Sequence, residues 1–273
     1  MHRRDKLFDP SQAPETLERI RASEPEARQD FVILFTARSG SSWLTEVCEN
    51  TGFLSRPDEC FNPEFMPEMT QVLGARNMDE YVEVLRRRRN TKGLFGCEAT
   101  YGQICAVFDN ADRFLQYFHN AHYFWLLRRD IVAQAISLAK MVTTGLGHSI
   151  QADVATIDRQ DRLFSYDSRL IWRWLNHILA EERGTADLLQ RFGLTPTAFS
   201  YEGMMARGAE AMANFLAVEL GLPERAKPGL QSRHAPFATA LNRDYAARFR
   251  REEVQGLQAV EAERATWLAS CRF

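Results

Sequence analysis

The chain has 273 residues, and its 45% hydrophobic content suffices for one large α/β domain or two small ones. Lys and Arg total 34 against 36 Asp and Glu, so no overall basic field attracts nucleic acid or an anionic membrane. The five cysteines form no CxxC pair and no compact pattern with histidine, which argues against a zinc site and a disulfide framework. Any anion-binding site must therefore be local.

The N-terminal segment, residues 1–30, is charged and contains no apolar core of signal-peptide length. No run of about eighteen apolar residues occurs, so we expect no integral membrane segment. These features predict a soluble protein with reduced thiols in the cytoplasm. We expect a single domain over 1–273, in which 1–30 are an N-terminal extension and 243–273 a helical C-terminal tail.

Residues 31–36, FVILFT, are a continuous apolar run of strand length, which predicts a strand buried on both faces of a parallel sheet. From Ser42 the apolar spacing becomes helical, and Thr51-Gly52 ends the pattern. The intervening ARSGSS therefore joins a buried strand to the N-terminus of a helix.

Strands and helices alternate along the rest of the chain. The sequence predicts strands at 93–97, 122–127 and 195–201, and helices at 104–118, 130–144 and 164–192. This alternation implies right-handed βαβ units, and hence a three-layer α/β fold with a central parallel sheet flanked by helices. Four consecutive arginines end a further helix within 81–90, and we interpret them as a solvated face that complements the helix dipole.

The ARSGSS loop has the composition of an anion site. The N–H groups at the start of a helix are unsatisfied and lie at the positive end of its dipole. The turn itself consists of Ser39, Gly40, Ser41 and Ser42. Gly40 permits close approach of the backbone, and Arg38 adds a fixed charge with a planar fork of N–H groups. The structural alternative is an N-capped helix after a buried strand, with Arg38 exposed to solvent.

The loop is not a Walker A motif, which needs GxxxxGK followed by Ser or Thr. Hydrolysis of magnesium-bound ATP is therefore disfavoured. A P-loop-like kinase or nucleotide hydrolase with a degenerate loop stays an alternative function, and magnesium-dependent ATP turnover would select it.

A second motif, LLRRDIVAQAISLAK, begins at the end of a predicted strand. Arg128 and Arg129 end that strand, and Ser137 follows Arg129 by eight residues on the next helix. A guanidinium at a strand end and a hydroxyl two helical turns onward can converge on one further phosphate. The alternative is an Arg pair that begins a loop and a small residue that packs a helix.

The chain resembles the PAPS-dependent sulfotransferases on TARSGSSWL and RRDIVAQAIS, and is most similar to their bacterial branch, typified by trehalose sulfotransferase. The resemblance implies a P-loop-like fold whose first loop binds the 5′-phosphosulfate of PAPS and whose later Arg and Ser bind the 3′-phosphate. It also implies sulfuryl transfer to a hydroxyl of a carbohydrate or glycolipid, and a possible homodimer. No metal is required, because Arg38 and the turn at 39–42 can stabilise the charge on the leaving phosphate.

The bacterial branch carries Gly-Glu-Pro-x-Glu-aromatic-Phe after its first helix, and the corresponding residues here read SRPDECF over 55–61. Glu59 falls on the position of the proposed catalytic glutamate, so the resemblance implies that Glu59 is the general base. Ser55, Arg56 and Cys60 depart from the family pattern. A carboxylate on a surface loop is the structural alternative for Glu59.

Other groups have weaker support. By order of elements alone, the resemblance implies that Arg233 of the QSRH stretch reaches the nucleotide. Glu98 and the pair Tyr201-Glu202 follow predicted strand ends, where α/β folds place ligands, and are acceptor or positioning candidates. Three single histidines, His148, His177 and His234, are more typical of structural or exposed positions. His148 follows a Gly-rich turn and could line an acceptor pocket. A non-catalytic nucleotide-binding module is a further alternative function.

Overall fold

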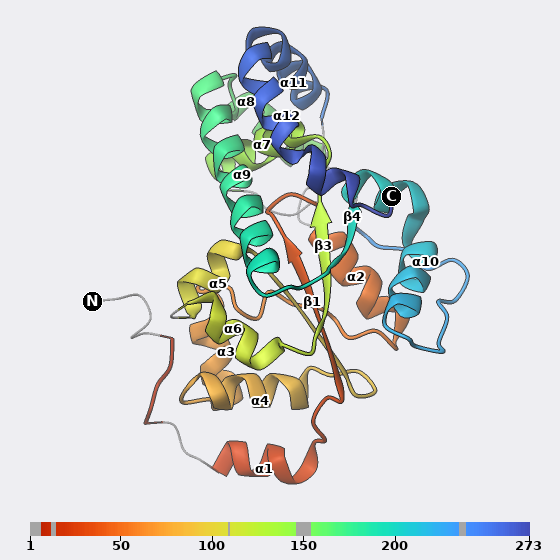
Figure 1. Ribbon diagram of the computed structural model, residues 1–273. Helices are drawn as coiled ribbons and strands as arrows, with labels where there is room; N and C mark the ends of the chain where they lie inside the picture. Colours follow the sequence, from red (N-terminus) through yellow and green to blue (C-terminus); the bar gives the residue numbers. More distant parts are fainter. Residues whose placement is uncertain (1–6, 12–14, 109, 146–153, 235–238) are drawn as a thin grey trace.

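Four parallel strands form the central sheet (Figure 1). In the computed structural model the described residues are 7–11, 15–108, 110–145, 154–234 and 239–273. The strands are β1 Gln29–Phe35, β2 Leu94–Ala99, β3 His122–Leu127 and β4 Thr197–Ser200. Their order is β2-β1-β3-β4, so β1 lies inside the sheet with a parallel partner on each side. The predicted parallel sheet is confirmed.

Helices surround this sheet. They are α1 Glu15–Ser23, α2 Ser41–Thr51, α3 Met66–Leu73, α4 Met78–Arg88, α5 Tyr101–Val107, α6 Ala111–Phe118, α7 Ile131–Thr144, α8 Val154–Leu163, α9 Ser168–Arg191, α10 Tyr201–Glu219, α11 Ala240–Glu252 and α12 Val254–Ala269.

Each face of the sheet has its own core, because alternate residues of a strand point to opposite sides. On one face, Val32 and Leu34 of β1 pack with residues of α1, α3, α4, α5 and α6. On the other face, Phe31 and Ile33 pack with residues of α2 and α10. The fold therefore has three layers, as the sequence predicted.

A third apolar cluster lies beyond the carboxyl ends of the strands, where Figure 1 shows α7, α9, α11 and α12 gathered together. Ile136, Leu175 and Phe249 are fully buried members of this cluster. Ala37, in the loop after β1, packs against it. That loop is consequently held between the sheet and the third cluster rather than exposed at the tip of the molecule.

The predicted helix over 104–118 is wrong, because two helices occupy this stretch. Phe108 has an extended backbone, with φ −92° and ψ 150°, and ends α5. Asn110 then begins α6 by accepting a hydrogen bond from the N–H of Arg113. Periodicity alone missed the break, since Phe108 turns inward to join the aromatic core and an Asn cap competes well with a continued helix.

Two arginines of the run, Arg88 and Arg89, are exposed as the sequence indicated, whereas Arg86 and Arg87 are partly buried. Each of the four side chains contacts a carboxylate from another segment of the chain or from its own helix. The pairs are Arg86 with Glu26 and Asp30, Arg87 with Glu26 and Glu83, Arg88 with Glu24, and Arg89 with Asp58. The run therefore connects α4 to the residues before β1 and to the segment at 55–61.

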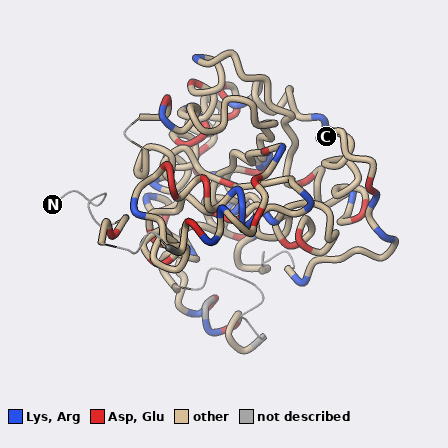
Figure 2. The backbone as a smooth tube through the Cα atoms, turned by 90° about the horizontal axis from the view of Figure 1, so that it is seen from below, with Lys and Arg blue, Asp and Glu red and all other residues tan. Residues whose placement is uncertain are grey.

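Basic and acidic residues are interspersed along the chain in Figure 2, in keeping with the net charge of −2. Within the described part of the chain, no helix combines the length and the apolar character that crossing a bilayer requires.

A fully buried ion pair joins the C-terminal helix to the long helix α9. Arg264 donates to both carboxylate oxygens of Glu182, and the two side chains are 1% and 0% exposed. Arg264 also donates to the carbonyls of Arg128 and Arg129, at 2.6 and 3.1 Å. Arg264 therefore holds the backbone of the two arginines of the second motif.

We expect Arg264→Met to lower the free energy of unfolding by about 3–5 kcal/mol, because it leaves the buried carboxylate of Glu182 without its cation. The double change Arg264→Met with Glu182→Met should recover much of that loss. Denaturant unfolding of the single and the double variant tests this. Equal free energies of unfolding for the two variants would contradict it.

Candidate active site

The loop between β1 and α2 turns through two residues of left-handed conformation. Arg38 has φ 67° and Gly40 has φ 91°. A Cβ atom on Gly40 would lie only 2.6 Å from Cδ2 of Tyr201, the first residue of α10. Glycine is required here by the positive φ and by the tyrosine ring, a packing reason that the sequence did not reveal.

The N-terminus of α2 presents hydrogen-bond donors. No side chain from the described residues caps it at Gly40. The N–H groups of Ser41 and Ser42 lie in the first turn, where an intrahelical carbonyl does not reach them. Ser39 is fully buried, and its Oγ has no hydrogen-bond partner among the described residues. Backbone and hydroxyl donors thus meet at the positive end of the helix dipole, an arrangement that fits a phosphate or sulfate.

Arg38 connects the two sequence motifs. Its Nε donates to Oγ of Ser137 on α7 at 2.9 Å, and its carbonyl accepts from Nη1 of Arg128 at 2.9 Å. Burial and the nearby charge of Arg128 lower the pKa of Arg38. Arg38 is half-buried, so the alternative of a solvent-exposed arginine does not hold. Two cations held close together favour an anion beside them, because the anion stabilises the charge on both.

In the structure Arg129 contacts Ser200 and Glu202. Arg129 Nε donates to Oγ of Ser200 at 3.1 Å, and its N–H donates to Glu202 at 2.9 Å. Arg128 instead lies at the loop, with its guanidinium carbon 4.7 Å from the ring centre of Tyr201. Its Nε has no hydrogen-bond partner within the described part of the chain. The two arginines follow the end of β3 and reach different partners, and Arg128 is the one that donates to the carbonyl of Arg38 in the loop.

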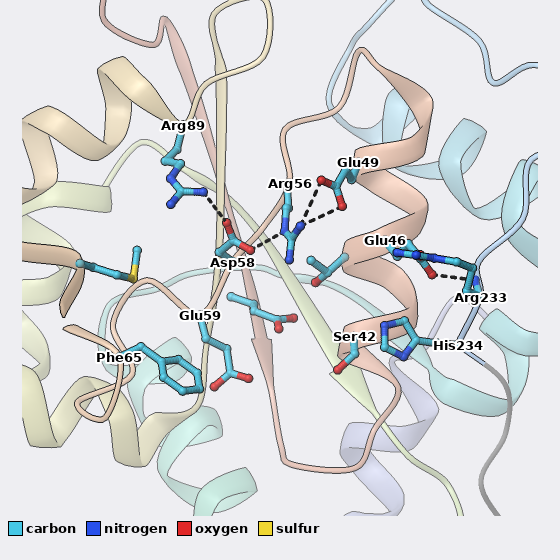
Figure 3. A pocket seen from close by; sticks show the side chains of 13 residues that line it. Ser42, Glu46, Glu49, Arg56, Asp58, Glu59, Phe65, Arg89, Arg233 and His234 are labelled. Carbon is cyan, nitrogen blue, oxygen red and sulfur yellow. Dashed lines mark hydrogen bonds and ion pairs between the residues drawn. The ribbon is translucent and has the colours of Figure 1, made fainter. Parts of the chain in front are cut away.

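A cavity of about 600 Å³ lies beside the first half of α2 (Figure 3). Figure 3 shows Ser42 and His234 on one side of it and Glu59 and Phe65 on the other. Its lining residues are Ser42, Thr45, Glu46, Glu49, Arg56, Asp58, Glu59, Phe65, Met69, Arg89, Glu98, Arg233 and His234. The first turn of α2 and the predicted base therefore border one space.

Most of the charges on this wall are paired. The ion pairs are Arg56 with Glu49 and Asp58, Arg89 with Asp58, and Arg233 with Glu46. Glu59 and Glu98 form no ion pair with any residue that the structure describes. These two carboxyl groups are consequently the ones available for chemistry or for ligand binding.

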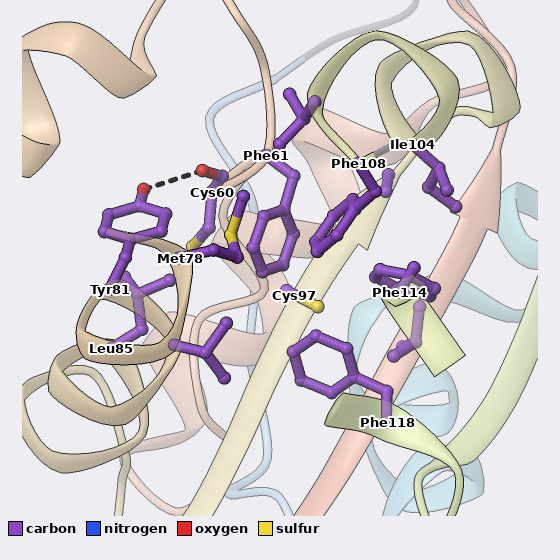
Figure 4. Close-up of a cluster of buried hydrophobic side chains, with 14 of the residues drawn as sticks. Cys60, Phe61, Met78, Tyr81, Leu85, Cys97, Ile104, Phe108, Phe114 and Phe118 are labelled. Carbon is purple, nitrogen blue, oxygen red and sulfur yellow. Dashed lines mark hydrogen bonds between the residues drawn. The ribbon is translucent and has the colours of Figure 1, made fainter. Parts of the chain in front are cut away.

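Phe61 anchors the segment that carries Glu59 (Figure 4). Its ring is fully buried, with centroids 5.2 Å from Phe108 and 5.7 Å from Phe118. The carbonyl of Cys60 accepts a hydrogen bond from Tyr81 Oη at 2.7 Å. Glu59 is therefore fixed by the buried residues that follow it, and it is not a carboxylate on a loose surface loop.

Two amide side chains orient the carboxylate of Glu59. Asn62 Nδ2 and Gln103 Nε2 both donate to its Oε2, at 2.9 and 2.6 Å. Gln103 is itself held by a capping box, since its Oε1 accepts from the N–H of Thr100. Glu59 Oε1 has no partner among the described residues. One oxygen is thus used for positioning, and the other has no protein partner within the described residues.

Arg233 lines the cavity from the segment after α10. Its Nε and N–H both donate to Glu46 of α2, as does the hydroxyl of Ser232. Although Glu46 is desolvated, these hydrogen bonds lower its pKa to about 2. Arg233 therefore lies against α2 at Glu46, and its side chain is 79% exposed.

The remaining candidates occupy different positions. His177 is exposed on α9 and packs edge-on against Trp174. His148 lies outside the described residues. Glu202 accepts from the N–H groups of Arg129 and Asp130, so it orders the start of α7 rather than the cavity.

The residues that orient the site were not among those predicted from the sequence. Asn62 and Gln103 hold Glu59, and Gln134 of α7 donates to Thr36 and to the carbonyl of Ala37, each at 2.8 Å. The Thr-x-x-Gln spacing before α5 is a capping-box signal, which could have located Gln103. No local pattern distinguishes Asn62 or Gln134.

The comparison with protein families decides the identity. Residues 30–252 match the family model described as Stf0 sulphotransferase. The chain belongs to this family. The resemblance seen in the sequence is thereby confirmed, and the protein is a transferase whose chemistry is sulfuryl transfer.

Among solved structures, this sulfotransferase is similar to a sulfotransferase from Alicyclobacillus acidocaldarius. The two share 17% sequence identity with a TM-score of 0.46, over 86% of this chain and 96% of that chain. No curated protein sequence gives a significant match.

Proposed function

We propose that this sulfotransferase moves the sulfuryl group of PAPS to a hydroxyl of a carbohydrate or glycolipid, with Glu59 as general base. The observation that carries the proposal is the shared cavity, which is bordered by Ser42 of the anion-binding turn and by Glu59. A donor bound at the turn and an acceptor bound beside Glu59 would meet there.

Arg38, Arg128 and Ser137 support the assignment of the nucleotide. They bring two cations and a hydroxyl to one end of the turn, next to the buried Ser39 hydroxyl. A nucleotide that carries phosphates at both its 3′ and 5′ positions needs two groups of anion-binding donors, and the two motifs supply them. Arg128, which faces the loop, is the better candidate of the arginine pair for the 3′-phosphate.

The proposed step is a direct in-line transfer. The acceptor oxygen forms a bond to sulfur while the bond between sulfur and the 5′-phosphate oxygen breaks, and the electron pair of that bond leaves on the phosphate. Glu59 takes the acceptor proton through Oε1. Arg38 and the turn at 39–42 stabilise the charge on the leaving phosphate, so the step needs no metal.

The resemblance to the bacterial branch also supports a homodimer.

The polar wall of the cavity supports a polyhydroxylated acceptor. Carboxylates, arginines and hydroxyls surround the space, and Phe65 and Met69 add one apolar patch. Phe65 is 52% exposed, so its ring is available to the apolar face of a sugar.

Thermal stabilisation by the product nucleotide tests the proposed donor. Adenosine 3′,5′-bisphosphate without metal should raise the melting temperature, and at about a hundredfold excess over Kd the stabilisation is about 2.7 kcal/mol. ATP with Mg²⁺ and ADP are the matched ligands, because each lacks the 3′-phosphate. Absence of a shift with the bisphosphate would overturn the proposal, and a larger shift with ATP and Mg²⁺ would favour a kinase or hydrolase.

A further inference from the structure

Glu98 is the second carboxyl group of the cavity without a cationic partner. It lies near the end of β2, where Cys97 and Ala99 point into the core beneath α4 and α5. Because strand residues alternate, Glu98 points to the opposite face, toward α2. It is 3% exposed, yet it is one of the residues that line the cavity.

The backbone places Glu98 beside Glu59. Asp58 forms a parallel bridge with Cys97, and the N–H of Glu98 donates to the carbonyl of Asp58 at 3.0 Å. Glu59 and Glu98 directly follow these two bridged residues, and the negative charge of Glu59 acts on Glu98. The segment at 55–61 thus extends the sheet edge and brings two carboxyl groups to one cavity.

The surroundings of Glu98 favour its neutral form. Burial raises its pKa well above the usual range of a glutamate, and the negative charges of Glu59 and Asp58 act in the same direction. Hydrogen bonds with Ser41 and Thr45 act in the opposite direction. The other titratable neighbours are thiols, which burial keeps neutral; they are Cys48, Cys60 and Cys97. The arginines of the cavity wall pair with other carboxylates.

One oxygen of this group lacks a protein partner. Glu98 Oε2 is buried and has no hydrogen-bond partner among the described residues. A buried polar atom without a partner is costly, and native proteins seldom keep one without a role. An acceptor bound in the cavity would supply the missing partner.

We propose that Glu98 works as a neutral carboxylic acid whose Oε2 donates a hydrogen bond to an acceptor oxygen next to the hydroxyl that Glu59 deprotonates. This rests on the proposed sulfotransfer at Glu59. The cavity then offers one proton acceptor and one proton donor side by side, which matches two neighbouring oxygens of a neutral polyol. An anionic Glu98 would instead place two negative charges there and would select an ammonium group.

Two substitutions of Glu98 separate the donor from the charge. Glu98→Gln keeps a donor of the same size without the charge, whereas Glu98→Leu keeps the size and removes the donor. With neutral disaccharides as acceptors, Glu98→Leu should raise KM about 10- to 100-fold with little change in kcat, and Glu98→Gln should retain most of the wild-type kcat/KM. With the wild type, amino sugars should show no lower KM than neutral disaccharides, because a neutral Glu98 does not attract their ammonium group.

The proton itself can be detected without any acceptor. A group whose folded pKa is raised holds a proton that the unfolded chain releases, so the free energy of unfolding falls as pH rises between the two pKa values. The wild type should show this slope above the normal glutamate range, and Glu98→Gln should lose a slope equivalent to one proton. Glu64→Gln, the same change at an exposed position nearby, should keep it.

Two results would overturn the proposal. One is a Glu98→Gln variant that loses acceptor affinity as severely as Glu98→Leu, and the other is an unchanged slope of stability with pH in Glu98→Gln. The 3′,5′-bisphosphate should stabilise all three variants as it does the wild type. Failure of that binding in the wild type would count against the proposed function, whereas failure of the Glu98 tests with binding intact counts against this inference alone.

Discussion

Glu59→Gln is expected to lower kcat by about 10²- to 10⁴-fold, the range that a positioned general base contributes. The glutamine keeps the size of the side chain, and its carbonyl can still accept from Asn62 and Gln103 in place of Oε2. It cannot take the proton of the acceptor hydroxyl. The loss should therefore appear in kcat, which a steady-state assay with saturating PAPS and acceptor measures.

Binding of the 3′,5′-bisphosphate to Glu59→Gln should match that of the wild type in calorimetry, because Glu59 lies across the cavity from the turn at 39–42. Glu64→Gln removes a carboxylate from the exposed part of the same segment and should leave turnover unchanged. Wild-type turnover in Glu59→Gln, with nucleotide still bound, would remove Glu59 from the role of base.

Arg38→Ala is expected to lower both nucleotide affinity and rate. It deletes the cation that joins the turn to Ser137, and the loss of charge-assisted hydrogen bonds should weaken binding of the bisphosphate about 10- to 100-fold. The charge that develops on the leaving phosphate is also less stabilised, so we expect kcat to fall by about 10²- to 10³-fold. Calorimetry with the bisphosphate and single-turnover kinetics measure the two effects separately.

Arg21→Ala is the matched control for this charge change, since Arg21 is exposed and pairs with Glu83 on α4. It should affect neither binding nor rate. Arg38→Lys keeps the charge without the planar fork and should fall between Arg38→Ala and the wild type. An Arg38→Ala variant that binds the bisphosphate as tightly as the wild type would contradict the assignment of this loop to the nucleotide.

The sequence predicted the parallel sheet and the turn from β1 into α2 because both depend on local patterns. Apolar runs of strand length, such as 31–36, indicate burial on both faces, and ARSGSS marks a helix start. The break at Phe108 was missed, because an inward-turned aromatic residue has the same periodicity as a continuing helix. The ion pairs of the arginine run were missed as well, since their carboxylates lie elsewhere in the chain.

At the active site, the residue types were readable and most of the contacts were not. The motifs indicated Arg38, Ser137 and Glu59, but the contact between Arg38 and Ser137 depends on how α7 packs beside the loop. That Arg128 contacts the loop and Arg129 contacts Ser200 depends on how the chain leaves β3. Neither of these contacts can be read from the local spacing of residues.

The sequence by itself determined that this chain has a buried β-strand leading into a serine-rich helix start, a second arginine-serine motif, and the family to which they belong. Only the tertiary structure decided that Glu98 stands next to Glu59. The two residues are far apart in the chain, and the bridge between Asp58 and Cys97 at the sheet edge brings them together. Pairing between distant segments depends on the packed core beneath them, which here is formed around Phe61.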